Sequence, residues 1–168
     1  MATVYFKDTK DFNSEGLGIL TALVEPVEVT ETMDGFFELT FAYSGGDSLA
    51  NYLKEGAYVK AQVNHYGKEL VFRIYEAEKD KINNIIYIQA ELKLLHDLRT
   101  SVLKASGFSP MTAEHMLKMV QRNSDPMIDF NVTGTPTVSN NFEYEDCNAY
   151  DLIYGENGIL AKTGAEIK

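Results

Sequence analysis

The chain has 168 residues and a mass of 18.8 kDa, which corresponds to one domain or two small ones and excludes a large multidomain protein. With 45% hydrophobic and 24% charged residues, its composition is that of a folded globular protein. Fifteen Lys and Arg residues against 25 Asp and Glu give a net charge of −10, which repels phosphates and anionic lipid headgroups, so we expect neither specific nucleic-acid binding nor binding to a membrane surface.

The first half of the chain has the pattern of antiparallel strands. Aromatic and β-branched residues recur in short runs over residues 27–92, and Gly, Asn and Asp separate the runs. Before this region, Val4, Phe6 and the stretch 19–24 predict an early pair of strands.

The clearest hairpin is predicted around Asp34-Gly35, a dipeptide that readily adopts the positive φ of a tight turn. Side chains of the strand that follows alternate between apolar and polar or small. One face of this strand is therefore expected in the core, and it carries Phe37, Leu39, Phe41 and Tyr43.

A second hairpin is predicted from 58–63, through Asn64-His65-Tyr66-Gly67, to 70–77. A charged turn at 78–81 then leads through 82–84 into a strand at 85–92. Strands and turns at this spacing favour an antiparallel sheet or a small barrel. We therefore predict an antiparallel β-barrel or meander domain over residues 1–93.

After Leu92 the apolar period becomes helical, and a short helix is predicted from Leu94, Leu95, Leu98 and Val102. Gly107 should break the chain, and Ser109-Pro110 should begin a second helix that ends at Asp125-Pro126. The apolar stripe predicted for this second helix consists of Ala113, Met116, Leu117 and Val120.

Residues 130–144 predict a loop followed by a short strand, and 148–154 predict a third helix capped by Gly155. Residues 158–168 have the pattern of a hairpin that is only beginning. Because its last strand would have no partner, we expect the chain to be a piece of a longer protein. Residues 94–168 are thus predicted to be an incomplete α/β domain, and the fold class is α+β.

The sequence points to no secretory or membrane-spanning segment. The first ten residues carry Lys7, Asp8 and Lys10 and lack the apolar run of a signal peptide. The longest strongly apolar stretch, 85–88, is far below the roughly 20 residues that a membrane helix needs. We expect a soluble protein without stable membrane insertion.

The single cysteine, Cys147, can form no internal disulfide and has no electropositive neighbours that would favour a thiolate. It follows Glu143, Glu145 and Asp146, whose negative charges should raise its pKa. We therefore interpret Cys147 as a small residue at a helix start, not as a nucleophile.

The other candidates for chemistry also favour structural roles. His65, His96 and His115 form no HExxH motif, and neighbouring helical residues such as Glu114 and His115 point about 100° apart, so we interpret the histidines as surface residues. The methionines near the second helix, Met111, Met116 and Met119, are expected mainly in a core. No carboxylate pair stands out as catalytic, and no motif calls for a cofactor or a metal.

Several segments together resemble the N-terminal hub region of phage tail-tip proteins, the tail-associated or prophage-endopeptidase-tail family of long-tailed phages. The segments follow one another in the order of that family and cover most of the chain. They are the Asp34-Gly35 turn with the strand 36–40, the strand 86–91 with Leu95-His96-Asp97-Leu98, the helix and turn at 148–158, and Gly164-Ala165-Glu166. The sequence departs from the family pattern at Leu92 and at Leu95-His96.

The resemblance implies a β-barrel hub domain and the start of an inserted α/β domain. It also implies a homotrimer at the tail tip of the virion that closes the tail tube and docks on the distal tail protein and other tail-tip proteins. DNA would pass through the lumen without specific binding. The family's endopeptidase activity belongs to domains further along, so we expect no enzyme in this region.

Two other functions stay open from the sequence. The first is a cell-wall hydrolase, which would need a carboxylate pair or a Cys–His pair in a cleft. The second is a carbohydrate- or receptor-binding β module, which would need exposed aromatic side chains along a groove; the candidates are Tyr43, Tyr58, Tyr66 and Tyr144.

Overall fold

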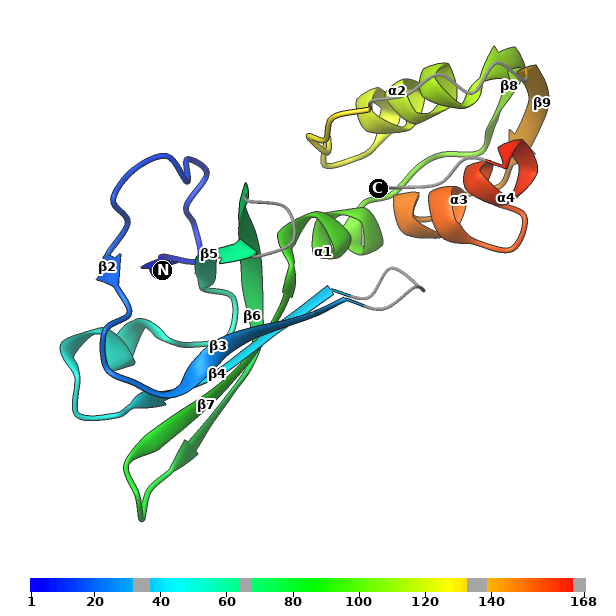
Figure 1. The fold of residues 1–168 in the computed structure, drawn as a ribbon. Helices are drawn as coiled ribbons and strands as arrows, with labels where there is room; N and C mark the ends of the chain where they lie inside the picture. Colours follow the sequence, from blue (N-terminus) through cyan, green and yellow to red (C-terminus); the bar gives the residue numbers. More distant parts are fainter. Residues whose placement is uncertain (32–36, 64–67, 133–138, 165–168) are drawn as a thin grey trace. The chain divides into compact units, whose positions relative to one another are not determined.

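The computed structural model describes residues 1–31, 37–63, 68–132 and 139–164. The chain divides into two compact units, Met1–Lys93 and Leu94–Lys168 (Figure 1). Antiparallel strands dominate the first unit, and helices with a strand pair make up the second. The predicted α+β class is confirmed.

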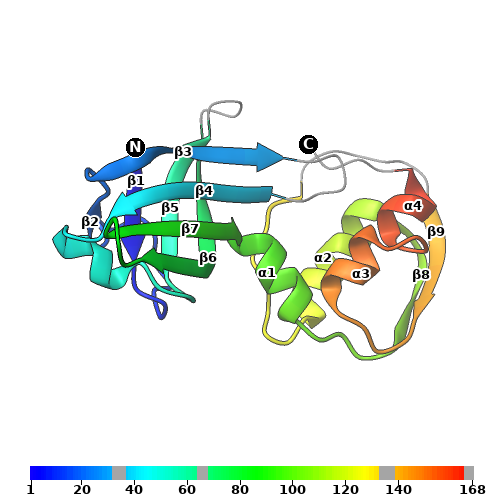
Figure 2. The same ribbon diagram turned by 90° about the horizontal axis from the view of Figure 1, so that it is seen from below.

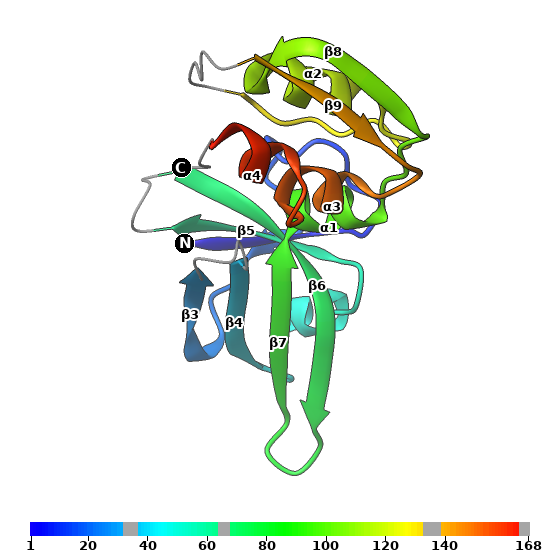
Figure 3. The same ribbon diagram turned by 90° about the vertical axis from the view of Figure 1, so that its right-hand side faces the viewer.

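The described residues of the first unit form one antiparallel sheet of seven strands in the order β2-β1-β5-β6-β7-β4-β3. The sheet curls into a half-barrel, as Figures 1 and 3 show. Its strands are β1 (Ala2–Tyr5), β2 (Gly18–Ile19), β3 (Leu23–Glu31), β4 (Phe37–Ser44), β5 (Tyr58–Val63), β6 (Lys68–Asp80) and β7 (Ile85–Leu92), with the 3-10 helix η1 (Ser48–Tyr52) between β4 and β5.

The core of this unit lies on one face of the sheet because apolar residues occupy every second position of its strands. The predicted core face of β4 is confirmed, since Leu39, Phe41 and Tyr43 are buried and Phe37 packs against them. Neighbouring strands contribute Val59, Ala61, Phe72, Ile74, Ile86 and Ile88.

The paired strands of the predicted hairpins are present, and β1 pairs with β2, but the stretch 19–24 is not one strand: Ile19 ends β2, whereas Leu23 and Val24 begin β3, which pairs with β4. Two further differences concern extent. β6 continues to Asp80, which pairs with Ile85, so the turn lies at 81–84 and not at 78–81. Cross-strand pairing with β7 keeps the charged residues 78–80 in the strand, and their side chains reach solvent there. Phe6 lies beyond the end of β1 and is exposed. The turns predicted at Asp34-Gly35 and at 64–67 lie outside the described residues.

In its described residues, the second unit combines a strand pair with helices α1 to α4 (Figure 2). Its elements are α1 (Lys93–Thr100), which begins at the unit boundary, β8 (Ser106–Thr112), α2 (Ala113–Asn123), β9 (Ser139–Tyr144), α3 (Ala149–Tyr154) and α4 (Ile159–Thr163). β8 and β9 pair in antiparallel fashion.

The segment before α2 differs from the prediction. Gly107 and Ser109-Pro110 lie within β8, so neither a chain break nor a helix start occurs there. Pairing with β9 supplies the hydrogen bonds of this segment, and Pro110 is tolerated because the register is irregular between Phe108 and Met111.

The helix α2 itself agrees with its predicted stripe. Its N-cap is Thr112, whose hydroxyl accepts the backbone N–H of His115. Ala113, Met116 and Val120 are buried. The helix ends at Ser124, directly before Asp125-Pro126.

The C-terminal hairpin predicted for 158–168 is wrong for the described residues, because Ile159–Thr163 forms α4. Ile159 and Thr163 stand one helical turn apart and are both buried, and Gly164 ends the helix at φ 67°. The unpaired strand from which we expected a longer protein is therefore not formed up to residue 164. Helix α3 is confirmed, with Asn148 as N-cap and Gly155 as C-cap.

Candidate assembly surface

The β3 edge (residues 23–31) is the longer of the two outer edges of the described sheet. β3 has nine residues and pairs with β4 alone in the described part of the chain, whereas the opposite outer strand, β2, has two. An edge of this length exposes backbone donors and acceptors that could pair with another chain. Pro26 has no backbone N–H and so interrupts the row of donors along this edge, and the exposed Glu25 and Glu28 give the edge negative charge.

The start of the β3 edge carries two adjacent apolar side chains. Leu23 is 38% exposed and Val24 is 50% exposed. Strict alternation would bury one of them, but the pairing with β4 shifts register between Leu23 and Glu25 and again before Glu28. The irregularity turns both side chains outward, while Val27 and Val29 further along pack against the core.

The β6–β7 tip (residues 79–84) is the second outward feature of this unit (Figure 3). Ile82 is 94% exposed there, and Lys79 and Lys81 beside it are exposed as well. The carboxylate of Asp80 accepts the backbone N–H of Ile82 at 2.8 Å and that of Asn83 at 3.2 Å. The other oxygen of this carboxylate accepts a hydrogen bond from Nδ2 of Asn83 at 2.7 Å, so both carboxylate oxygens stabilise the turn.

Those hydrogen bonds also change the pKa of the Asp80 carboxyl group. They hold the pKa of Asp80 below its ordinary value, the side chain of Asn83 contributing most, because each donor stabilises the charged carboxylate. Asn84 closes the turn at φ 54°, and its carbonyl accepts the N–H of Gly45 at 2.7 Å. The tip is therefore an ordered turn attached to the β4–η1 loop.

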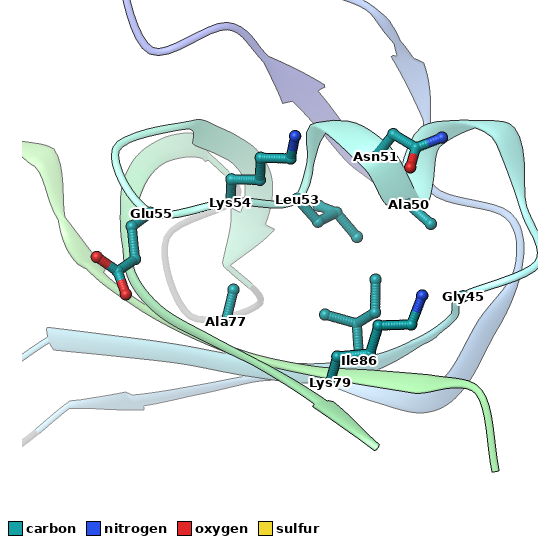
Figure 4. Close-up of a pocket in the computed structure, with 9 residues that line it drawn as sticks. All are labelled: Gly45, Ala50, Asn51, Leu53, Lys54, Glu55, Ala77, Lys79 and Ile86. Atoms are coloured by element: carbon teal, nitrogen blue, oxygen red, sulfur yellow. The ribbon is translucent and has the colours of Figure 1, made fainter. Parts of the chain in front are cut away.

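A hollow of about 410 Å³ lies between η1 and the hairpin of β6 and β7 (Figure 4). Leu53 and Ile86 point toward each other across it, and Ala50 and Ala77, on opposite sides, add to its apolar lining. Its rim carries Lys54, Glu55, Asn51, Lys79 and Gly45. The rim combines both charges, and the two lysines make the hollow a poor receptor for a basic group.

An acidic group surrounds Tyr75 on the same sheet. The Tyr75 hydroxyl donates to the carboxylate of Glu38 and lies 2.8 Å from Oε1 of Gln89. Burial raises the pKa of Tyr75 well above its usual range, and the charges of Glu38, Glu76 and Glu91 add to the effect. The phenol stays protonated, and its single hydrogen is donated to the Glu38 carboxylate.

Cys147 is a free, half-buried thiol in the second unit. Its backbone pairs with that of Leu103 in an isolated β-bridge. Burial raises the pKa of the thiol, and the carboxylates of Asp151 and Asp146 raise it further. The predicted direction therefore agrees with the structure, with burial as the first cause and with Asp151 in place of Glu143 and Glu145.

The described histidines lie on helices, as predicted. His96 lies on α1 and is half-buried, and His115 is exposed on α2, where its Nδ1 lies 3.0 Å from the Thr112 hydroxyl. His65 lies outside the described residues. Over residues 1–31, 37–63, 68–132 and 139–164, no cluster of three or more His, Cys, Asp or Glu side chains could hold a metal ion.

The tyrosines proposed for a binding groove do not lie on one exposed surface. Tyr43 is buried in the core, Tyr58 is half-buried and packs edge-on against Phe12, and Tyr144 is half-buried in the second unit. Tyr66 lies outside the described residues. The most regular aromatic arrangement was not predicted: Tyr150 stacks on Tyr154 at 4.8 Å, with the Arg99 guanidinium 4.7 Å above the Tyr150 ring.

Three exposed apolar residues were not predicted from the sequence: Ile82, Leu23 and Val24. A signal existed for Ile82, because an aliphatic residue between Lys81 and Asn83-Asn84 stands alone in a polar turn. None existed for Leu23 and Val24, since apolar strand residues ordinarily indicate a core. In the part of the chain that the structure describes, no helix has both the length and the apolarity to cross a membrane.

Comparison with known proteins gives a distant likeness among solved structures. No family model and no curated protein matches the chain. Among solved structures it is similar to the E. coli c3393 protein, a component of the type VI secretion system with structural similarity to the T4 bacteriophage tail proteins gp27 and gp5. The two share 12% identity at a TM-score of 0.41, over 86% of this chain and 41% of that one. The chain thus spans less than half the length of that protein.

Proposed function

We propose that this chain is a structural hub subunit of a phage-type tail tip, which assembles with copies of itself and docks on the distal tail protein. The observation that carries the proposal is the β3 edge, nine residues long and unpaired on its outer side in the described sheet, with Leu23 and Val24 exposed at its start. A monomer gains nothing from such an edge, whereas an assembly can pair or cover it.

The order of the hub-like segments along the sequence supports the same function. The predicted strand pair on either side of Asp34-Gly35 corresponds to β3 and β4, and the helix and turn that resemble the family at 148–158 correspond to α3 and Gly155. In this proposal the protein is a homotrimer at the virion tail tip. The net charge of −10 suits a lumen through which DNA passes, because like charge prevents adhesion.

We further infer that this region acts without catalysis. Cys147, the only thiol, has a raised pKa and two carboxylates close by, which is the reverse of what a thiolate nucleophile needs. The hollow of Figure 4 has one carboxylate on its rim, Glu55, whereas glycoside hydrolysis ordinarily uses two. A peptidoglycan-cleavage assay on the purified chain should therefore give no product above buffer.

The direct test is the mass in solution, measured by light scattering on the chain alone and after mixing with the candidate distal tail protein. A trimer, or a stable mixed complex, is the expected result. A chain that stays monomeric and ignores the tail protein would contradict the proposal and would direct attention to glycan binding.

A further inference from the structure

The β6–β7 tip has the properties of an interface anchor. Ile82 is 94% exposed, yet its backbone is fixed by the carboxylate of Asp80, which also binds Asn83. An aliphatic side chain on a turn that is already ordered loses little conformational freedom when it binds. Anchors of this kind supply a large share of the binding energy of protein interfaces.

The charge of the tip indicates the chemistry of its partner. Lys81 directly precedes Ile82 and Lys79 stands two residues before Lys81, and neither lysine makes an ion pair within the described residues. The two lysines outnumber the one carboxylate of the tip, Asp80, so the tip keeps a net positive charge on a chain whose overall net charge is −10. Its complement is an apolar spot beside carboxylates. The hollow of Figure 4 is unsuitable because Lys54 and Lys79 stand on its own rim.

The β3 edge offers that complement. Leu23 and Val24 are exposed at its start, directly before Glu25 and Glu28, which are also exposed and make no ion pair within the described residues. The acidic group around Tyr75 fits less well, because the Tyr75 hydroxyl already occupies Glu38.

Direct pairing of two β3 edges is disfavoured by the same residues. Glu25 and Glu28 of two copies would face like charges, and Pro26 removes a backbone donor. The β3 edge of one copy is therefore not expected to pair with the β3 edge of another. It can instead bind a basic group from a different surface of a second copy.

We propose that the β6–β7 tip of one copy docks on the β3 edge of a second copy. Ile82 packs against Leu23 and Val24, and the two tip lysines lie beside Glu25 and Glu28. This contact rests on the self-assembly in the proposed function and gives that assembly a defined surface.

The test is charge reversal on each side of the contact. One variant carries Lys79→Glu and Lys81→Glu, and the other carries Glu25→Lys and Glu28→Lys. Each places like charges across the contact, so its self-association, measured by light scattering at low salt over a range of concentrations, should weaken by about tenfold or more. A chain that carries all four substitutions has a reversed tip and a reversed edge, so its copies again present opposite charges across every contact, and association should return to within about threefold of the wild type.

Two controls separate this contact from other effects. Lys7→Glu with Lys10→Glu changes the net charge as much as the tip variant does, at exposed lysines away from the tip, and should leave association unchanged. Ile82→Ser should weaken association, while Met127→Ser, at another exposed apolar residue, should not. Far-UV circular dichroism checks that every variant is folded.

The outcomes that overturn the contact differ from those that overturn the function. If the wild type is an oligomer and neither charge reversal weakens it, the copies contact each other through another surface. The hub proposal would then stand without this contact. A wild-type chain that is monomeric at every concentration would overturn both this contact and the proposed self-assembly. Loss of the distal-tail-protein complex in the tip variant, with self-association unchanged, would assign the tip to the distal tail protein and overturn docking on a second copy.

Discussion

The hydroxyl of Tyr43 donates a hydrogen bond to Oδ1 of Asp47 at 2.8 Å, and the same oxygen accepts the backbone N–H of Leu49 at 2.8 Å. Asp47 is the N-cap of η1, and Tyr43 is a buried residue of β4. One carboxylate thus joins the wall of the hollow to the core of the sheet. Burial raises the pKa of Tyr43 and the bond to Asp47 adds to it, so the phenol stays protonated and remains a donor.

Asp47→Ala should lower the free energy of unfolding by about 1–3 kcal/mol, because it removes the cap and leaves the buried Tyr43 hydroxyl without this acceptor. Asp47→Asn keeps an acceptor oxygen and should cost less. Denaturant unfolding, fitted with a transition for each unit, measures the difference. Equal losses for the two variants would show that charge, and not hydrogen bonding, is what Asp47 contributes.

Gly16 should tolerate substitution far less well than Gly164, although both have positive φ. A Cβ at Gly16 would lie 2.6 Å from the carbonyl oxygen of Val4, whereas one at Gly164 would have no atom of the described residues within 4 Å. Gly164→Ala should cost about 1 kcal/mol for the left-handed backbone alone. Gly16→Ala should cost about 2 kcal/mol or more, since the backbone of β1 must also move. Thermal unfolding of the two variants checks the ranking.

The β6–β7 tip should loosen in acid. Because the folded pKa of Asp80 lies below its ordinary value of 3.8, its contribution is complete above that value and is lost as the pH falls through the folded pKa. The amide resonance of Ile82 should therefore titrate with a midpoint below 3.8. Asp80→Asn retains an acceptor and removes the titration, which makes it the matched control. A midpoint above the ordinary value would contradict the hydrogen bonds to Ile82 and Asn83.

Cys147 should react slowly with iodoacetamide near neutral pH, because burial, Asp151 and Asp146 all raise its pKa and only the thiolate is nucleophilic. Asp151→Asn removes one of these charges and should speed alkylation by roughly twofold to threefold. Glu156→Gln removes an exposed carboxylate that has no part in the shift and should leave the rate unchanged. A wild-type rate equal to that of a free thiol would contradict the raised pKa.

The elements predicted correctly are those whose signals lie within a few residues. The alternation at Leu39, Phe41 and Tyr43 identified the core face of β4, and the stripe of Met116 and Val120 identified α2. Helix α3 begins after Asn148 and ends at Gly155, because a side-chain cap and a glycine each act on the adjacent turn.

The predictions were wrong where contacts with residues far away in the sequence determine the secondary structure. Ser109-Pro110 has the local form of a helix start, but β9, some thirty residues further on, pairs with this segment and makes it a strand. Gly158 and Gly164 can flank a strand or a short helix, and burial of Ile159 and Thr163 against the rest of the unit selects the helix.

The amino-acid sequence by itself determined the α+β class, the core face of β4, the apolar stripe of α2 and the glycine cap of α3, because periodicity and capping act over a single turn or strand. Only the tertiary structure decided the strand order, the open β3 edge and the exposure of Ile82. Whether an apolar side chain is buried depends on which distant segments cover it. The candidate assembly surface could not be predicted for that reason: Leu23, Val24 and Ile82 belong to a surface only because no other part of the described chain packs over them.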